Sequence, residues 1–192
     1  MDTYHVVLYL HFLSLFLGVG AAGVIGVCLF RLRAAQTLAD AIPFGTLAGQ
    51  TERVFPVVIV GLFATGAYMT SDVWTWSTPW IKVSIVGLVL VALQGPLLAG
   101  RRAHLLKQAL RENGPGPLGD PARKMTRDPI LWIVTFANPA IVFAIVWNMT
   151  EKPGWGESIA SVLVGYAVGV GLALLFSRAP HDDPVASTEP VG

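Results

Sequence analysis

The fold class is decided by residues 4–30, which read YHVVLYLHFLSLFLGVGAAGVIGVCLF and contain no Lys, Arg, Asp or Glu. A helix that crosses a membrane needs about 20 apolar residues, and this run is longer than that. It is also longer than the apolar core of a signal peptide, and no basic residue precedes it. We therefore expect residues 4–30 to form a retained transmembrane helix.

Four more apolar runs follow it, at residues 54–70, 80–100, 129–149 and 159–176. None alternates between apolar and polar residues as a half-buried strand would, and isolated strands cannot satisfy their backbone groups in lipid. The sequence therefore predicts an all-α fold, a polytopic membrane helix bundle with about five transmembrane helices. We expect residues 1–178 to form a single transmembrane domain and residues 179–192 to be a disordered cytoplasmic tail.

The composition agrees with a membrane protein. Of the 192 residues, 54% are hydrophobic and 13% are charged, whereas soluble domains carry about 25% charged residues. The formal net charge of +1 provides no field that would attract nucleic acid. We expect the lipid bilayer to be the main partner, with a membrane protein or a second copy of this chain as further partners. The one cysteine, Cys28, excludes a disulfide within the chain.

Basic residues predict the orientation, because Lys and Arg are retained on the cytoplasmic side. They gather in the connections after the first and third predicted helices, whereas the other two connections carry a single Lys152. The basic residues assigned to the cytoplasmic side are Arg31, Arg33, Arg53, Arg101, Arg102, Lys107, Arg111, Arg123, Lys124, Arg127 and Arg178. This pattern predicts an N-out, C-in protein of the bacterial inner membrane.

The two basic connections differ in composition. Residues 31–53 contain scattered apolar side chains interrupted by Pro43 and Gly45, which favours an ordinary loop over a short helix lying on the membrane surface. Residues 112–121 contain the run Asn-Gly-Pro-Gly-Pro, which predicts a flexible link.

His11 is the leading candidate for a chemical site. At 1.5 Å per residue it lies roughly 10 Å below the outer surface, where an imidazole can bind haem iron or a metal. The alternative is a neutral histidine that hydrogen-bonds to a neighbouring helix. Lys82 lies near the same surface on the third predicted helix, where its ammonium either reaches water or turns inward to pair with a propionate.

Two deeper polar residues, Gln94 and Asn138, are on the third and fourth predicted helices. Their similar depth predicts an interhelical hydrogen bond that stabilises the bundle. Glycines on the first and fifth helices, including the Gly165/Gly169 pair, predict close helix packing. A weaker pattern places four copper(I)-type ligands near the outer surface, namely Met1, His5, Met69 and Met149.

Several short motifs carry a family resemblance. Leu10-His11-Phe12-Leu13 resembles the opening helix of bacterial inner-membrane proteins of unknown function, some similar in pattern to copper-resistance protein D and to the haem-dependent protoporphyrinogen oxidase of the HemJ type. Pro79-Trp80-Ile81-Lys82 and Trp147-Asn148-Met149 support the unknown-function group. The resemblance implies a four-helix unit over residues 4–153. It also implies His11 and Lys82 as cofactor-binding residues for haem b.

Three functions follow from these observations. The first is a non-enzymatic accessory or scaffold subunit whose buried polar groups are structural. The second is a haem-b-binding redox protein with His11 as an axial ligand. The third is a copper or small-solute transporter. The sequence names no catalytic residue, and it leaves the metal, the reaction and the substrate open.

Overall fold

The computed structural model describes residues 2–178, in which every regular element is a helix. The elements are α1 (Thr3–Ala34), α2 (Leu38–Thr51), η1 (Glu52–Val54), α3 (Phe55–Val73), α4 (Pro79–Gln94), η2 (Gly95–Gly100), α5 (Arg101–Glu112), α6 (Asp120–Thr126), α7 (Pro129–Glu151) and α8 (Trp155–Arg178). The predicted tail at residues 179–192 lies outside the described residues.

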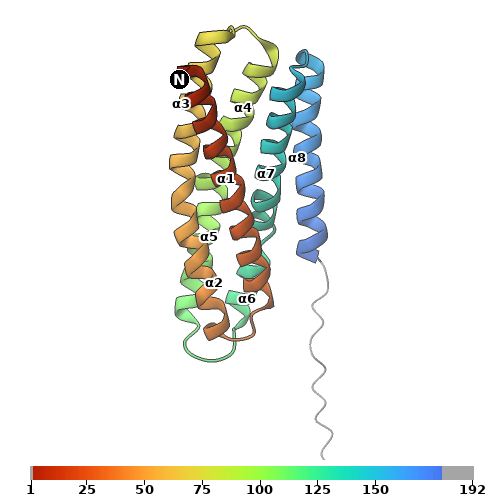
Figure 1. Cartoon of the computed structure of the whole chain (residues 1–192). Coiled ribbons are helices and arrows are strands. Elements are labelled where there is room, and N and C mark those ends of the chain that lie inside the picture. Colours follow the sequence, from red (N-terminus) through yellow and green to blue (C-terminus); the bar gives the residue numbers. More distant parts are fainter. Residues whose placement is uncertain (1, 179–192) are drawn as a thin grey trace, which may run out of the picture.

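These elements form an elongated bundle in which helices follow one another end to end (Figure 1). Five stretches are long and apolar enough to cross a membrane: Thr3–Ala34, Leu38–Val73, Pro79–Glu112, Asp120–Glu151 and Trp155–Arg178. Each of the five predicted segments lies within one of them. The prediction of an all-α bundle with five membrane-capable helices is therefore confirmed.

The loop predicted at residues 31–53 is wrong, because most of it is α2. Thr37 and Asp40 form a reciprocal capping box at the start of this helix. Ala41 on α2 is fully buried, which shows that the helix is fixed by packing as well as by its cap. The alternative, a short helix that lies on the membrane surface, would run across the bundle. Instead, α2 runs along the bundle and continues through η1 into α3 (Figure 1).

The flexible link predicted at residues 112–121 is a folded turn. The side-chain oxygen of Asn113 accepts a hydrogen bond from the Gly119 amide at 2.6 Å, and the side-chain amide of Asn113 donates to the Pro117 carbonyl at 3.0 Å. Leu118 is buried, and its amide donates to the carbonyl of Gln36 at 2.9 Å. The turn is thus attached to the connection between α1 and α2.

Small residues bring two pairs of helices close together. A Cβ added at Gly169 would lie 2.5 Å from the Cα of Ala137, so α7 and α8 touch backbone to backbone. On α1, a Cβ added at Gly18 would lie 2.8 Å from the side chain of Val58 on α3. Gly171, in contrast, has nothing within 4 Å of that position. The predicted role of glycine in close packing holds at particular positions rather than along whole helices.

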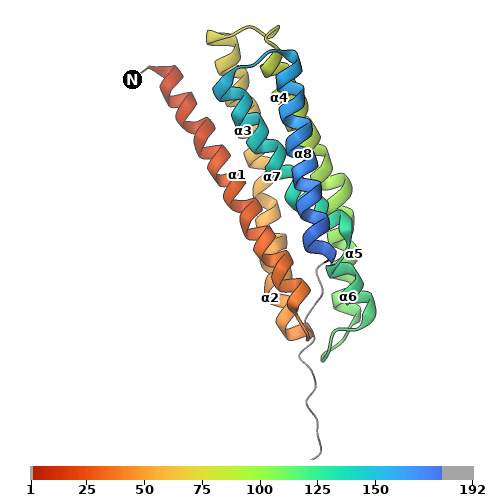
Figure 2. The same cartoon turned by 90° about the vertical axis from the view of Figure 1, so that its right-hand side faces the viewer.

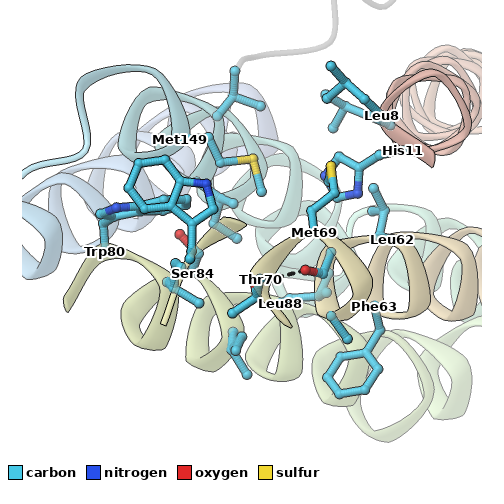
Figure 3. A pocket seen from close by; sticks show the side chains of 18 of the residues that line it. Leu8, His11, Leu62, Phe63, Met69, Thr70, Trp80, Ser84, Leu88 and Met149 are labelled. Atoms are coloured by element: carbon cyan, nitrogen blue, oxygen red, sulfur yellow. Dashed lines mark hydrogen bonds between the residues drawn. The ribbon is translucent and has the colours of Figure 1, made fainter. Parts of the chain in front are cut away.

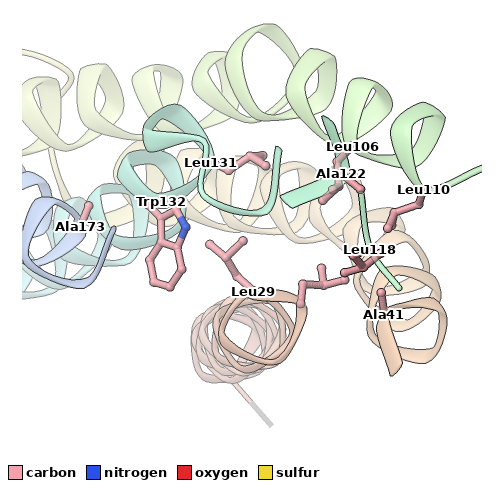
Figure 4. Packing of buried hydrophobic residues seen from close by; sticks show 10 residues of the cluster. Leu29, Ala41, Leu106, Leu110, Leu118, Ala122, Leu131, Trp132 and Ala173 are labelled. Atoms are coloured by element: carbon pink, nitrogen blue, oxygen red, sulfur yellow. The ribbon is translucent and has the colours of Figure 1, made fainter. Parts of the chain in front are cut away.

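The buried apolar core gathers at one end of the bundle, where α1 finishes, α2, α5 and α6 lie, and α7 begins (Figure 4). We call this the packed end. Trp132 is fully buried there, and its indole N–H donates to the Thr126 carbonyl at 3.1 Å. The buried members of this cluster are Leu29, Leu32, Ala41, Leu106, Leu110, Leu118, Ala122, Leu131, Trp132 and Ala173.

The hydrogen bond predicted between Gln94 and Asn138 is absent. The side-chain oxygens of both residues are buried and have no hydrogen-bond partner. Similar depth on neighbouring helices was the basis of the prediction, but the rotation of each helix decides whether two side chains meet. The two amides therefore do not join α4 to α7 as predicted.

Candidate functional site: a cavity around His11

A cavity of about 330 Å³ lies at the end of the bundle opposite the packed end. We call it the His11 cavity, and it is lined by α1, α3, α4 and α7 together with the connection between α3 and α4 (Figure 3). The lining side chains with polar or sulfur atoms include His11, Met69, Thr70, Ser84, Met149 and Lys152. Most of the remaining wall is aliphatic or aromatic.

The cavity exists because α1 and α7 meet only toward the packed end. There, Gly26 is close to Thr135, and the rings of Phe30 and Trp132 have centroids 4.9 Å apart. Toward its N-terminus α1 leans away from α7, while α8 covers a different side of α7 (Figure 2). The cavity lies between the N-terminal half of α1 and the C-terminal half of α7, and we call this space the wedge.

His11 enters this cavity from α1 and is 5% exposed. Its Nδ1 lies 2.8 Å from the hydroxyl oxygen of Thr65 on α3. The Thr65 hydroxyl lies 2.5 Å from the Gly61 carbonyl, which can only accept, so the hydroxyl donates its hydrogen there. Thr65 must then accept from His11, which assigns the hydrogen of the neutral ring to Nδ1 and leaves a lone pair on Nε2.

Ser84 enters from α4 and is 6% exposed. Its hydroxyl oxygen is buried and has no hydrogen-bond partner. Thr70, on α3 in the same cavity, behaves differently, because its hydroxyl donates to the Gly66 carbonyl one turn back at 2.8 Å. A buried polar atom without a partner is rare enough in folded proteins to require an explanation.

Three tryptophans from the α3–α4 connection and the start of α4 line the cavity, and we call this part of the lining the rim. Trp74 and Trp80 pack edge to face with ring centroids 5.5 Å apart, and Trp76 also contributes to the lining. The ammonium of Lys152 lies 5.0 Å from the centroid of the Trp74 ring, so this charge is held by a cation–π contact at the rim. The interior beyond the rim is therefore neutral and largely apolar.

The structure does not bring Lys82 together with His11. Lys82 is exposed and does not line the His11 cavity; its ammonium lies 5.7 Å from the centroid of the Trp155 ring on α8. The roles of His11 and Lys82 in cofactor binding stay predictions.

Of the copper(I)-type ligands predicted near the outer surface, two line the His11 cavity and a third does not. The thioethers of Met69 and Met149 line the His11 cavity (Figure 3). His5 is instead exposed and lies 3.4 Å from the carboxylate of Asp2, while Met1 lies outside the described residues. Among residues 2–178 no three His, Cys, Asp or Glu side chains are grouped to hold a metal ion.

Sequence reasoning missed Ser84 and Thr65. Ser84 interrupts the apolar run 80–100 two residues after Lys82, and two residues rotate a helix by about 200°. The two side chains thus point to nearly opposite sides, which was a usable signal that they do not share a site. Thr65 gave no such signal, because its partner is 54 residues away in sequence.

Protein-family models, curated proteins and solved structures give no match to this chain.

Proposed function

We propose that this chain is a non-enzymatic integral membrane protein that binds a small lipid-soluble molecule in the His11 cavity. In this proposal the five long helices cross the bacterial inner membrane with the N-terminus outside and the C-terminus in the cytoplasm. The His11 cavity then lies in the outer half of the bilayer. The role of the protein is to hold or hand over that molecule, as an accessory subunit of a membrane assembly would.

The single observation that carries this proposal is the character of the cavity. Its volume of about 330 Å³ lies within the range of about 300–1,000 Å³ found for small-molecule sites. Its walls are mostly apolar, with a few buried polar atoms, which is the usual design of such sites. The wedge between α1 and α7 faces acyl chains in a membrane, so an apolar ligand can enter from lipid.

Haem b with His11 as an axial ligand is a second candidate, favoured by the free lone pair on Nε2. The residue predicted to pair with a propionate, Lys82, is turned toward Trp155 instead. Lys152 is the basic residue among the described lining. A Soret band in the visible spectrum of the protein purified after haem supplementation would favour haem over the proposed ligand class.

The binding proposal is tested by filling the cavity. Ala67 lines it and Ala64 is exposed on the same helix, so Ala67→Phe blocks the space and Ala64→Phe is the matched control. Each protein is purified from bacterial membranes and extracted with organic solvent, and small molecules are quantified by mass spectrometry. We expect a molecule in stoichiometric amount with the wild type and Ala64→Phe, reduced at least fivefold in Ala67→Phe. Equal amounts from all three proteins would refute binding in this cavity.

The orientation has its own test. An alkaline phosphatase fused after Gly192 should be inactive, because this enzyme needs the oxidising exterior to form its disulfides. A green fluorescent protein at the same position should be bright. Active phosphatase would exclude the C-in arrangement.

A further inference from the structure

Among residues 2–178, Ser84 carries the buried hydroxyl that has no hydrogen-bond partner; the other unpartnered buried oxygens, on the amides of Gln94 and Asn138, do not line the cavity. Helical Ser and Thr residues commonly donate to the carbonyl four residues earlier. Here Ser14, Thr65, Thr70, Thr135 and Thr150 do so, at 2.5 to 3.0 Å. Ser84 does not, although it is 6% exposed and its oxygen is shielded from solvent. The hydroxyl is left available inside the cavity.

His11 presents the complementary group. Its Nδ1–H is committed to Thr65, so Nε2 can only accept a hydrogen bond. Figure 3 shows His11 and Ser84 on different sides of the cavity, one from α1 and the other from α4. A ligand that satisfies both must donate a hydrogen at one end and carry an oxygen at the other.

The walls between these two groups suit a flat aromatic ring. Trp80 lines the cavity together with the thioethers of Met69 and Met149, and the exposed rings of Phe12 and Phe63 lie at its edge. Sulfur–aromatic contacts are favourable, and aromatic rings pack edge to face or offset against one another. The absence of a carboxylate among the described lining residues also favours a neutral ligand over a cation.

From these three observations we propose that the His11 cavity binds the ring of a quinol, a neutral aromatic ring with hydroxyl groups at opposite ends. One hydroxyl donates to Nε2 of His11, and the oxygen of the other accepts from the Ser84 hydroxyl. The apolar tail of the quinol leaves through the wedge between α1 and α7 into lipid. This inference rests on the proposed function and names the class of its ligand.

The same geometry discriminates between the reduced and oxidised forms. A quinone has carbonyl oxygens, which only accept hydrogen bonds, so it can bind Ser84 but leaves Nε2 of His11 unsatisfied. A site that offers an unmatched polar group rejects the ligand that cannot pair with it. The cavity therefore selects the quinol, and Thr65 acts as the positioning residue because it fixes the imidazole tautomer.

The test uses 2-decyl-1,4-benzoquinol and 2-decyl-1,4-benzoquinone with the full chain in lipid nanodiscs under anaerobic conditions. Binding is measured by equilibrium dialysis, with empty nanodiscs giving the background from lipid. One hydrogen bond contributes about 1 kcal/mol net, so we expect the wild type to bind the quinol about fivefold more tightly than the quinone. His11→Ala and Ser84→Ala should each weaken quinol binding about fivefold, whereas the exposed-site controls His5→Ala and Ser71→Ala should not change it.

Thr65→Val tests the tautomer through the ratio of quinol affinity to quinone affinity. A misfolded variant would lose both affinities and would not bind the quinone more tightly. Valine removes one acceptor of the imidazole hydrogen, while the Leu62 carbonyl still accepts from the His11 ring. The tautomer that donates from Nε2 to a quinone therefore becomes more populated. We expect the ratio of the two affinities to fall toward one, with the quinone bound more tightly than by the wild type. An unchanged ratio would contradict the role of the tautomer.

The outcomes separate the two proposals. Equal affinity of the wild type for quinol and quinone, or silver(I) binding that Met69→Leu abolishes and quinol does not displace, would overturn the quinol assignment. If a cavity-dependent molecule is still extracted from the protein, small-molecule binding survives that result. If Ala67→Phe changes neither extraction nor quinol binding, both proposals fail.

Discussion

Asp128 and Ser84 are equally buried, at 6% exposure, but they lie at opposite ends of the bundle and differ in their partners. At the packed end, Asp128 accepts from Arg102 at 3.0 Å and from the Ile130 amide at 2.9 Å. At the cavity end, Ser84 has no partner. The difference leaves an unpaired hydroxyl in the cavity, where the proposed ligand would supply the missing hydrogen-bond partner.

The largest expected effect comes from replacing one tryptophan at each end of the bundle by alanine. Trp132→Ala removes a fully buried ring from the packed end, which should lower the free energy of unfolding by about 3 kcal/mol. Trp80→Ala enlarges an existing cavity, so we expect a loss of about 1 kcal/mol. Thermal unfolding in mild detergent measures both. Equal losses would remove the distinction between the two ends.

The second test concerns the ion pair at the packed end. Asp128→Asn keeps the hydrogen bond to Ile130 but weakens the pair with Arg102, whose side chain is 36% exposed. Because water partly solvates Arg102, we expect a loss of only about 1 kcal/mol in the free energy of unfolding. Asp72→Asn, at an exposed position, is the control and should stay within about 0.5 kcal/mol of the wild type. A larger loss in the control would contradict the importance of burial.

The smallest test compares two hydroxyls in the cavity. Ser84→Ala removes an unpartnered hydroxyl, so the free energy of unfolding without ligand should stay the same or rise by up to about 1 kcal/mol. Thr70→Val removes a hydroxyl that donates to Gly66 and should lower it by about 1 kcal/mol. Chemical unfolding in detergent resolves the sign. A loss in Ser84→Ala as large as that in Thr70→Val would show that Ser84 has a partner within the chain.

The sequence was sufficient for the five long helices, because the length of an apolar run reports directly on its ability to cross a membrane. It was misleading at Pro43 and Gly45, which suggested a loop. There the capping box of Thr37 and Asp40 and the burial of Ala41 favour a helix. The cap was visible in the sequence; the packing surface was not, because it comes from elements distant along the chain.

The candidate site was predictable only in part. His11 stood out because a histidine in an apolar run is costly, and it does line a cavity. Its predicted companion Lys82 was chosen by depth and by a family resemblance, and neither accounts for the rotation of the helix. Ser84 was overlooked because a serine in a helix usually satisfies itself, so its free hydroxyl is visible only in the structure.

The hydrogen bonds between the α1–α2 connection and the α5–α6 turn have a consequence for synthesis on the ribosome. The Leu38 amide at the start of α2 donates to the Gly116 carbonyl at 2.9 Å, and the Leu118 amide donates back to Gln36. Chain elongation at roughly 5–20 residues per second separates the appearance of these partners by several seconds. The first two long helices are therefore made before the turn that hydrogen-bonds to the connection between α1 and α2.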